Sequence, residues 1–302
     1  MNLDLVIAYG SAAEQLARRT AQLSGAEVVE VNRRLFPDGE QYVKVSGEVK
    51  GKDVAVFQSF AFHPDTLLVE YALIVDALKG MGCSRVIGVL PYLAYARQDE
   101  RFNRGEPLSA RVFASLIEAT GTDEVFTVDM HLHRFHEIRE VFSIPASNLT
   151  AMPLLAGHYL EKGGSPNALV VGPDSESRQW ASKVSESLSS ECVILEKERL
   201  GDRQVKVSEL RGSNLGSAVI VDDMVSTGRT LLEVIGKLRR IGIERIDAIA
   251  THSLLVEDAF IRLRDAGLAS LITTDTIENP HTKVSVAPLL ARTLLEKYGG
   301  RG

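Results

Sequence analysis

The stretch VIVDDMVSTGRT, Val219 to Thr230, decides the fold of this chain. Its first three residues, Val219 to Val221, are apolar and β-branched, which is typical of a short buried strand. Two carboxylates, Asp222 and Asp223, come next, followed by the small-residue turn Ser226 to Gly228. Apolar residues then recur with the spacing of one helical face: Leu231, Val234, Ile235 and Leu238. A buried strand, an acidic pair, a small turn and a helix in this order predict a ligand site where the strand ends.

The turn has the chemistry of an anion site. Successive backbone N–H groups and the positive end of the following helix attract a phosphate, and Thr227 and Thr230 can add hydroxyl donors. The two carboxylates would repel a phosphate, but they suit sugar hydroxyls or a hydrated Mg²⁺ ion. A ribose phosphate carries both kinds of group and therefore fits both halves of the motif. The competing interpretation is a surface turn after a buried strand, with a solvated pair of aspartates.

Composition is that of a globular protein without a membrane segment. The chain has 302 residues, of which 45% are hydrophobic and 25% charged, and its formal net charge is −6. This negative balance argues against a nucleic-acid partner, and no apolar run approaches the roughly 20 residues that a membrane span needs. The first residues, MNLDLVIAYG, resemble a strand more than a signal peptide. Because the only two cysteines, Cys83 and Cys192, lie far apart in the sequence, we expect a cytoplasmic protein.

Strand-like and helix-like segments alternate along almost the whole chain. Short apolar runs predict strands at residues 5–9, 54–58, 86–90, 125–128, 169–171, 193–195, 218–221 and 246–250. Amphipathic runs predict helices at residues 12–23, 66–79, 177–188 and 288–298. Such alternation predicts an α/β fold in which helices cover both faces of a parallel sheet.

The two halves of the chain follow a similar plan. In each half an amphipathic helix is followed by a glycine, Gly121 or Gly242, and then by a strand that leads to a histidine, His131 or His252. We therefore expect two related domains. Their predicted extents are residues 1–148 and 149–287, and we expect the C-terminal helix, residues 288–302, to pack back on the first domain.

A second stretch, Val89 to His133, narrows the assignment. It contains the block Tyr95 to Asp99 (YARQD) and an Asp-x-His motif, Asp129 to His131, at the end of a predicted strand. This stretch resembles the nucleotide-binding region of phosphoribosyl-diphosphate (PRPP) synthetases, also called ribose-phosphate diphosphokinases. The turn Ser226 to Gly228 resembles the PRPP-binding loop that these enzymes share with type I phosphoribosyltransferases.

Further motifs occur in the order of the synthetase family and extend over nearly the whole chain: FPDGE at 36–40, GPD at 172–174, KER at 197–199 and TDTI at 274–277. The chain is most similar to the archaeal-type members. The resemblance implies two similar domains of type I phosphoribosyltransferase-like fold, each a mostly parallel sheet flanked by helices. It also implies transfer of the diphosphoryl group of ATP to the 1-hydroxyl of ribose 5-phosphate, which yields PRPP and AMP and feeds nucleotide biosynthesis.

The resemblance also implies roles for individual residues. Lys197 and Arg199 match a flexible-loop pair that closes over the phosphates, and they are the implied catalytic residues. His131 and Asp174 are the implied ligands of Mg²⁺. The implied ATP-binding residues are Phe36, Asp38, Gly39, Glu40, Arg97, Gln98 and Asp99. The implied ribose 5-phosphate-binding residues are Arg199, Asp222, Asp223, Ser226, Thr227, Gly228, Arg229 and Thr230.

In this family the FPDGE residues reach the adenine pocket of a neighbouring subunit, so the resemblance implies at least a homodimer.

Two positions depart from the common bacterial pattern. Ser226 stands where an aspartate is usual, as in the archaeal type, and Arg229 replaces a glycine, where it could hold the 5-phosphate directly or point outward. Two other functions stay open: a catalytically silent paralogue with a regulatory role, and a phosphoribosyltransferase.

Overall fold

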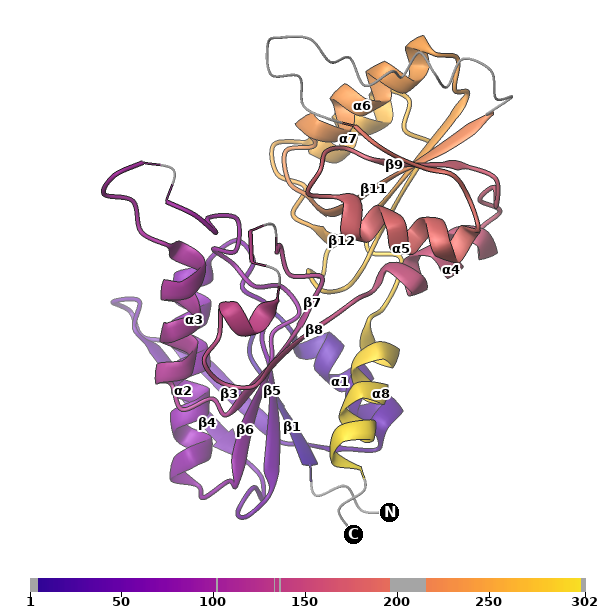
Figure 1. Cartoon of the computed structure of the whole chain (residues 1–302). Helices are drawn as coiled ribbons and strands as arrows, with labels where there is room; N and C mark the ends of the chain where they lie inside the picture. Colours follow the sequence, from indigo (N-terminus) through magenta and orange to yellow (C-terminus); the bar gives the residue numbers. More distant parts are fainter. Residues whose placement is uncertain (1–4, 102, 133, 136, 196–215, 300–302) are drawn as a thin grey trace. The chain divides into compact units, whose positions relative to one another are not determined.

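The structure, a computed structural model, describes residues 5–101, 103–132, 134–135, 137–195 and 216–299 (Figure 1). The chain forms two compact units. Unit 1 comprises Met1–Leu149, Thr276–Glu278 and Ser285–Gly302, and unit 2 comprises Thr150–Asp275 and Asn279–Val284. Each unit contains a parallel β-sheet flanked by helices, which confirms the predicted α/β fold class. Among the described residues, no helix has both the length and the apolar character needed to cross a membrane.

Unit 1 is built on six parallel strands in the order β2-β1-β5-β6-β7-β8. The strands are β1 (Leu5–Tyr9), β2 (Glu27–Val28), β5 (Asp53–Phe57), β6 (Arg85–Val89), β7 (Glu124–Val128) and β8 (Ala146–Leu149). The four central strands are rich in valine and almost entirely buried, as expected for strands that are covered on both faces.

Four α-helices cover this sheet. They are α1 (Glu14–Ser24), α2 (Pro64–Gly80), α3 (Ser109–Ala119) and α8 (Ala287–Tyr298), and a short 3₁₀ helix, η1 (Ile138–Glu140), precedes β8. Helices α2 and α3 lie on one face of the sheet, and α1 and α8 lie together on the other (Figure 1). This division follows from right-handed crossovers, because β5-α2-β6 and β6-α3-β7 move across the sheet in the opposite direction from β1-α1-β2.

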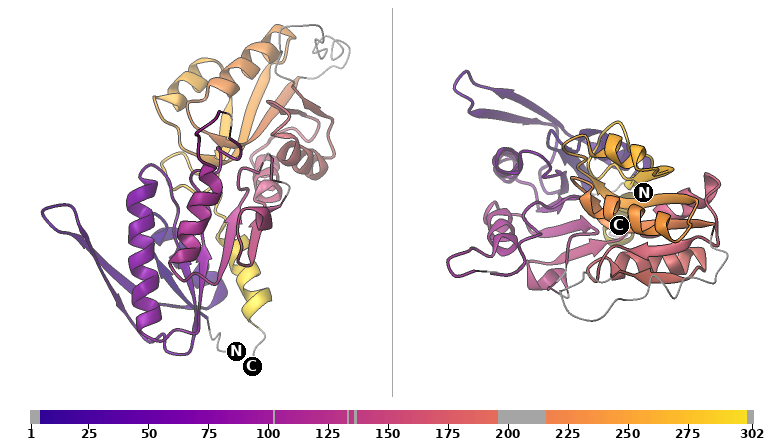
Figure 2. Two further views of the ribbon diagram at one scale, coloured as in Figure 1. Left: turned by 60° about the vertical axis from the view of Figure 1, so that its left-hand side comes forward. Right: turned by 90° about the horizontal axis from the view of Figure 1, so that it is seen from above.

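Two further strands, β3 (Glu30–Leu35) and β4 (Gln41–Ser46), form an antiparallel hairpin outside the six-stranded sheet. Figure 2 shows this hairpin projecting from unit 1. Its base is held by the Tyr9 hydroxyl, which donates a hydrogen bond to Glu30 (2.6 Å). The sequence analysis did not predict these strands because only one residue in each of them is buried, so that the apolar alternation of a strand is faint.

The described residues of unit 2 form five parallel strands in the order β10-β9-β11-β12-β13. The strands are β9 (Leu169–Gly172), β10 (Cys192–Ile194), β11 (Ser217–Val225), β12 (Arg245–Ser253) and β13 (Ser270–Thr273). Helices α4 and α5 pack on one face, and α6 and α7 pack on the other (Figure 1). The helices are α4 (Met152–Glu161), α5 (Arg178–Leu188), α6 (Arg229–Arg240) and α7 (Ala259–Asp265).

Strand β11 is longer than the sequence analysis predicts. It extends to Val225 and so includes Asp222 and Asp223, which were expected to follow the strand. The extension has a partner on one side only, because pairing with β12 continues to Val225 whereas pairing with β9 ends at Ile220. Strand β12 therefore fixes the backbone of Asp222 and Asp223 from one side. On the side that faces β9, both aspartates lie beyond Ile220, the last residue of β11 that pairs with β9.

The C-terminal helix α8 belongs to unit 1 and packs on α1. Near its end, the Tyr298 hydroxyl donates a hydrogen bond to Glu124 of β7 (2.6 Å), and Lys297 forms an ion pair with the same carboxylate. Glu124 is only 6% exposed, so these two partners compensate a charge that would otherwise be buried without a counterion.

Replacing Tyr298 with phenylalanine should destabilise the protein. The ring still fills its site, but Glu124 loses a donor, and an under-satisfied buried group costs about 1–3 kcal/mol. Urea and thermal unfolding should report this loss. The control is Arg292→Gln in the same helix, whose side chain is 69% exposed. It should change the free energy of unfolding by less than about 0.5 kcal/mol, and equal stability of both variants would contradict the proposed anchoring.

Candidate active site

Three carboxylates of unit 2 lie close together where neighbouring strands end. Asp174 follows β9, and Asp222 and Asp223 occupy the extension of β11. The pKa of the Asp222 carboxyl is raised well above its usual range because the group is buried and because the negative charges of Asp223 and Asp174 lie nearby. A hydrogen bond from the Asp223 backbone N–H to Asp222 (3.0 Å) offsets only part of this effect. A bound cation or a hydroxyl donor would relieve the repulsion.

The turn between Asp174 and α5 fixes the orientation of the Asp174 carboxylate. Its Oδ1 accepts hydrogen bonds from the backbone N–H groups of Glu176 (3.1 Å) and Ser177 (3.3 Å). The hydroxyl of Ser177, which is fully buried, donates in turn to the Asp174 carbonyl oxygen (2.6 Å). Ser177, which is the N-cap residue of α5, was not predicted as a site residue from the sequence.

The turn after β11 leads directly into α6. Gly228 is the N-cap of this helix and has a left-handed backbone conformation (φ 73°), and Arg229 is the first helical residue. A Cβ atom at Gly228 would lie 3.3 Å from Leu263, so this position combines a positive φ with a close neighbour and favours glycine. Arg229 is already in the helix and does not need a positive φ, so the backbone accepts an arginine at this position. Its side chain is exposed.

The backbone N–H groups at this helix start are available to a ligand. Within the described part of the chain, those of Thr227 to Thr230 have no hydrogen-bond acceptor. Amides of this kind at the N-terminus of a helix bind anions, helped by the helix dipole. One strand-turn-helix thus brings the predicted ribose 5-phosphate residues Asp222 to Thr230 together.

The donor set of unit 2 suits a hard cation. In the described ranges no group of three or more His, Cys, Asp or Glu side chains is arranged to hold a metal ion. Mg²⁺ does not require such a group, because it is usually bound by one or two carboxylates together with water and phosphate oxygens of the substrate. The oxygen donors of Asp174, beside the negative charge of Asp222, fit Mg²⁺ of this type and do not suit zinc, which favours nitrogen and sulfur.

In unit 1, His131 follows a fixed turn at the end of β7. Asp129 turns the chain with a left-handed conformation (φ 41°), which is strained for a residue other than glycine. Its N–H donates to the Leu149 carbonyl oxygen (2.8 Å), and the Met130 N–H donates to the side-chain oxygen of Asn148 (2.9 Å). Asn148 is a second residue that the sequence analysis missed, because it acts on β7 from the neighbouring strand β8.

The YARQD block lies beyond the end of β6, the strand next to β7. Arg97 is exposed, and Gln98 accepts a hydrogen bond from the Ser109 hydroxyl. Asp99 is only 6% exposed, and it accepts hydrogen bonds from the backbone (2.9 Å) and the guanidinium (3.1 Å) of Arg134. Asp99 therefore ties this block to the segment that follows His131, which brings two of the predicted motifs of unit 1 together.

The remaining ATP-binding residues predicted for unit 1 lie at the tip of the β3–β4 hairpin: Phe36, Asp38, Gly39 and Glu40. The Phe36 N–H closes the turn by donating to the Glu40 carbonyl oxygen (2.8 Å). Figure 2 shows the hairpin projecting from unit 1, and Gln41, the residue after Glu40, donates a hydrogen bond to the Thr66 carbonyl oxygen of α2 (2.8 Å).

An arginine braces the aromatic residue at this tip. The guanidinium of Arg34 lies over the rings of Phe36 (4.5 Å) and Tyr42 (4.6 Å), a cation–π arrangement. Arg34 and Tyr42 pair across the hairpin. Neither residue was predicted from the sequence, although Arg34, two residues before Phe36, points to the same side of an extended strand.

The predicted catalytic residues Lys197 and Arg199 lie outside the described residues.

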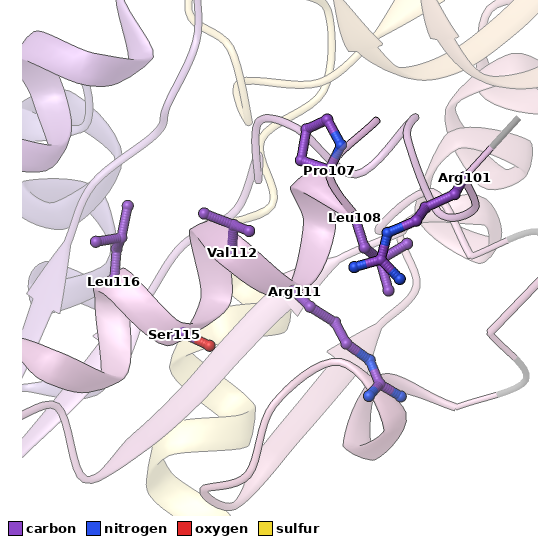
Figure 3. A pocket seen from close by; sticks show the side chains of 7 residues that line it. All are labelled: Arg101, Pro107, Leu108, Arg111, Val112, Ser115 and Leu116. Carbon is purple, nitrogen blue, oxygen red and sulfur yellow. The ribbon is translucent and has the colours of Figure 1, made fainter. Parts of the chain in front are cut away.

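A pocket of about 540 Å³ lies along α3 (Figure 3) and is lined by Arg101, Pro107, Leu108, Arg111, Val112, Ser115 and Leu116. It includes none of the predicted site residues, and its apolar side chains Val112 and Leu116 are exposed on the outer side of the helix.

Comparison with known proteins identifies both halves of the chain. Residues 5–121 match the family model of the N-terminal domain of ribose phosphate pyrophosphokinase, and residues 137–265 match that of the phosphoribosyl transferase domain. These matches confirm the predicted phosphoribosyltransferase-like architecture.

Individual relatives agree over almost their full length. A ribose-phosphate pyrophosphokinase of Methanothermobacter thermautotrophicus is 38% identical over 287 residues, which cover 93% of this chain and 96% of that protein. One of Methanopyrus kandleri is 36% identical and covers 96% and 98%. The crystal structure of phosphoribosylpyrophosphate synthetase from Mycobacterium smegmatis superposes with a TM-score of 0.85 at 30% identity over 99% of both chains. By motif order, fold and full-length similarity, the chain belongs to the ribose-phosphate pyrophosphokinase family of enzymes.

Proposed function

We propose that this enzyme transfers the diphosphoryl group of ATP to the 1-hydroxyl of ribose 5-phosphate and so produces PRPP and AMP for nucleotide biosynthesis. The observation that carries the proposal is the arrangement in unit 2, where amides without acceptors directly follow the carboxylates Asp222 and Asp223. A small ligand with a phosphate at one end and hydroxyls at the other matches both groups. The names of the relatives, which specify a ribose phosphate and a pyrophosphate group, support the same choice.

In the ribose 5-phosphate half, the amides of Thr227 to Thr230 and the hydroxyls of Ser226, Thr227 and Thr230 hold the 5-phosphate. Arg229, exposed at the first position of α6, adds positive charge to the same anion. Asp222 and Asp223 accept hydrogen bonds from the ribose hydroxyls, which lowers their mutual repulsion. Arg199 completes this set.

In the ATP half, Arg97 and Gln98 contact the nucleotide, and Asp99 supports them through its hydrogen bonds to Arg134. The hairpin tip supplies its residues to the ATP site of a second copy, as the resemblance to this family implies. The enzyme is therefore at least a homodimer, with the adenine end of each ATP site formed by Phe36, Asp38, Gly39 and Glu40 of the neighbouring copy.

The reaction needs positive charge more than it needs a base. The 1-hydroxyl oxygen attacks the β-phosphorus of ATP, the bond from that phosphorus to the bridging α-phosphate oxygen breaks, AMP leaves, and the hydroxyl proton is released. Negative charge grows on the transferred and leaving oxygens, and Lys197 and Arg199 offset it. His131 and Asp174 would hold Mg²⁺, which would supply further positive charge to the phosphate oxygens.

A direct assay tests the proposed reaction. Incubation of the enzyme with ATP, Mg²⁺ and ribose 5-phosphate should produce AMP and PRPP in equal amounts, measured by ion-pair chromatography. Omission of ribose 5-phosphate should abolish AMP formation. A phosphoribosyltransferase would instead consume PRPP when a nucleobase is present, and a silent paralogue would form no AMP above background. Either result would exclude the proposed activity.

Lys197→Ala should lower turnover far more than it weakens ATP binding. A positive charge that acts on the developing oxyanions contributes mainly in the transition state, so we expect kcat to fall about a hundredfold or more while the Kd for ATP changes little. Lys183→Ala, which removes an exposed lysine of α5, serves as the control and should leave both values unchanged. Equal losses in kcat and ATP affinity would argue against a transition-state role for Lys197.

Asp222→Asn should stabilise the ligand-free enzyme. A carboxyl whose pKa is raised in the folded state binds its proton more tightly there than in the unfolded state, so the free energy of unfolding falls as the pH rises through this range. The asparagine removes this effect. The melting temperature of the variant should therefore exceed that of the wild type at neutral pH, and the difference should shrink as the pH is lowered.

The same substitution should weaken ribose 5-phosphate binding by roughly tenfold to a hundredfold, because hydrogen bonds from hydroxyls to a charged acceptor are lost. Thermal unfolding across a pH series and the KM for ribose 5-phosphate provide the two measurements. Asp265→Asn, an exposed aspartate of α7, should change neither. An unaltered KM in Asp222→Asn would show that this carboxylate does not contact the sugar.

A further inference from the structure

The carbonyl groups behind the anion-binding turn are held by a neighbouring segment of unit 2. The Val225 carbonyl oxygen accepts hydrogen bonds from the N–H groups of Leu254 (2.9 Å) and Leu255 (3.1 Å), and that of Ser226 accepts one from Val256 (3.2 Å). These donors follow β12 and precede α7. We call residues 254–258 the clamp segment.

A side chain continues this row of contacts. Nη2 of Arg262, on α7, donates a hydrogen bond to the Thr227 carbonyl oxygen (3.0 Å), and the Gly228 carbonyl oxygen accepts one from Leu232 N–H within α6 (2.9 Å). Four consecutive carbonyls, from Val225 to Gly228, are thus engaged. Of these five hydrogen bonds, the one to Thr227 is made by a charged side chain, and a charge-assisted hydrogen bond is the stronger kind.

The row of carbonyl contacts sets the direction of the amides. In a planar trans peptide the N–H of one residue points opposite to the carbonyl of the residue before it. Holding the Thr227 carbonyl on the α7 side therefore directs the Gly228 N–H to the other side, where it has no acceptor among the described residues. A cationic donor on the carbonyl also polarises that peptide and makes its N–H a better donor to an anion.

Backbone strain is concentrated in the clamp segment. Leu255 (φ 46°), Glu257 (φ 55°) and Asp258 (φ 55°) all have left-handed conformations, each of which costs about 1–2 kcal/mol for a residue other than glycine. Strain of this size persists only where surrounding contacts impose it, and it is common at functional sites. Helix α7 also approaches the turn closely, since a Cβ atom at Gly228 would lie 3.3 Å from Leu263.

We propose that Arg262 is a positioning residue for ribose 5-phosphate: it does not touch the substrate, but it holds the Thr227 peptide so that the Gly228 N–H points at the 5-phosphate. The inference rests on the proposed function of this turn. It predicts a selective defect, because the orientation of one amide matters to the sugar phosphate and has no bearing on ATP.

The test compares two arginines of α7. Arg262→Met keeps an unbranched apolar stem and removes the donor, and it should raise the KM for ribose 5-phosphate about tenfold while the KM for ATP stays unchanged. Arg262→Lys keeps a charged donor and should recover part of this loss. Arg264→Met is the control, because the side chain of Arg264 is 63% exposed and pairs with the neighbouring Asp265. It should behave like the wild type.

Calorimetric titration with ribose 5-phosphate in the absence of ATP separates this inference from the proposed reaction. Arg262→Met should weaken binding about tenfold whether or not any PRPP is formed. A wild type that binds ribose 5-phosphate but forms no PRPP would overturn the proposed reaction only. Arg262→Met with wild-type affinity, or a rise of both KM values by the same factor, would overturn the positioning role, and a wild type without any affinity for ribose 5-phosphate would overturn both. If Arg262→Met does not fold, Arg262→Gln, which shortens the side chain and removes its charge, is measured in its place and should show the same selective loss of ribose 5-phosphate affinity.

Discussion

The site in unit 2 depends on strand β11, which extends beyond the end of its pairing with the neighbouring strand β9. Strand β11 continues along β12 after its pairing with β9 has ended, so Asp222 and Asp223 have a fixed backbone and an open side. In a parallel sheet, ligands bind beyond the carboxyl ends of the strands, where loops and helix N-termini meet. Here the same few residues end a strand, turn through Gly228 and start α6, so acceptors for hydroxyls and donors for a phosphate come from one continuous piece of backbone.

The ligand-free protein carries unfavourable energy in the places that the proposed function uses. Buried negative charge raises the pKa of Asp222, and left-handed backbone occurs at Asp129 before His131 and in the clamp segment behind the turn. Each feature opposes folding by itself and must be compensated by the two well-packed sheets. Charge and strain of this kind are common at functional sites, where the surrounding structure imposes them.

The fold class and the family could be predicted from the sequence because both leave local signals, namely short apolar runs at regular intervals and motifs in a fixed order. Contacts between distant segments left no such signal. The end of β11 depends on the length of β12, and Arg262 is 35 residues away from the carbonyl that it binds. The β3–β4 hairpin has one buried residue in each strand, and the cation–π contacts of Arg34 help to hold its tip, so apolar alternation could not reveal it.

Helix α8 makes unit 1 discontinuous in the chain: the strands are complete by Leu149, but the helix that supplies the partners of Glu124 follows almost the whole of unit 2. During synthesis on the ribosome, the N-terminal sheet must therefore wait for more than a hundred residues, roughly the size of a small domain, before that carboxylate and the face beside α1 are covered. Until α8 has been made, the apolar surface that it covers beside α1 stays exposed, and exposed surface of this kind makes a folding intermediate prone to aggregation.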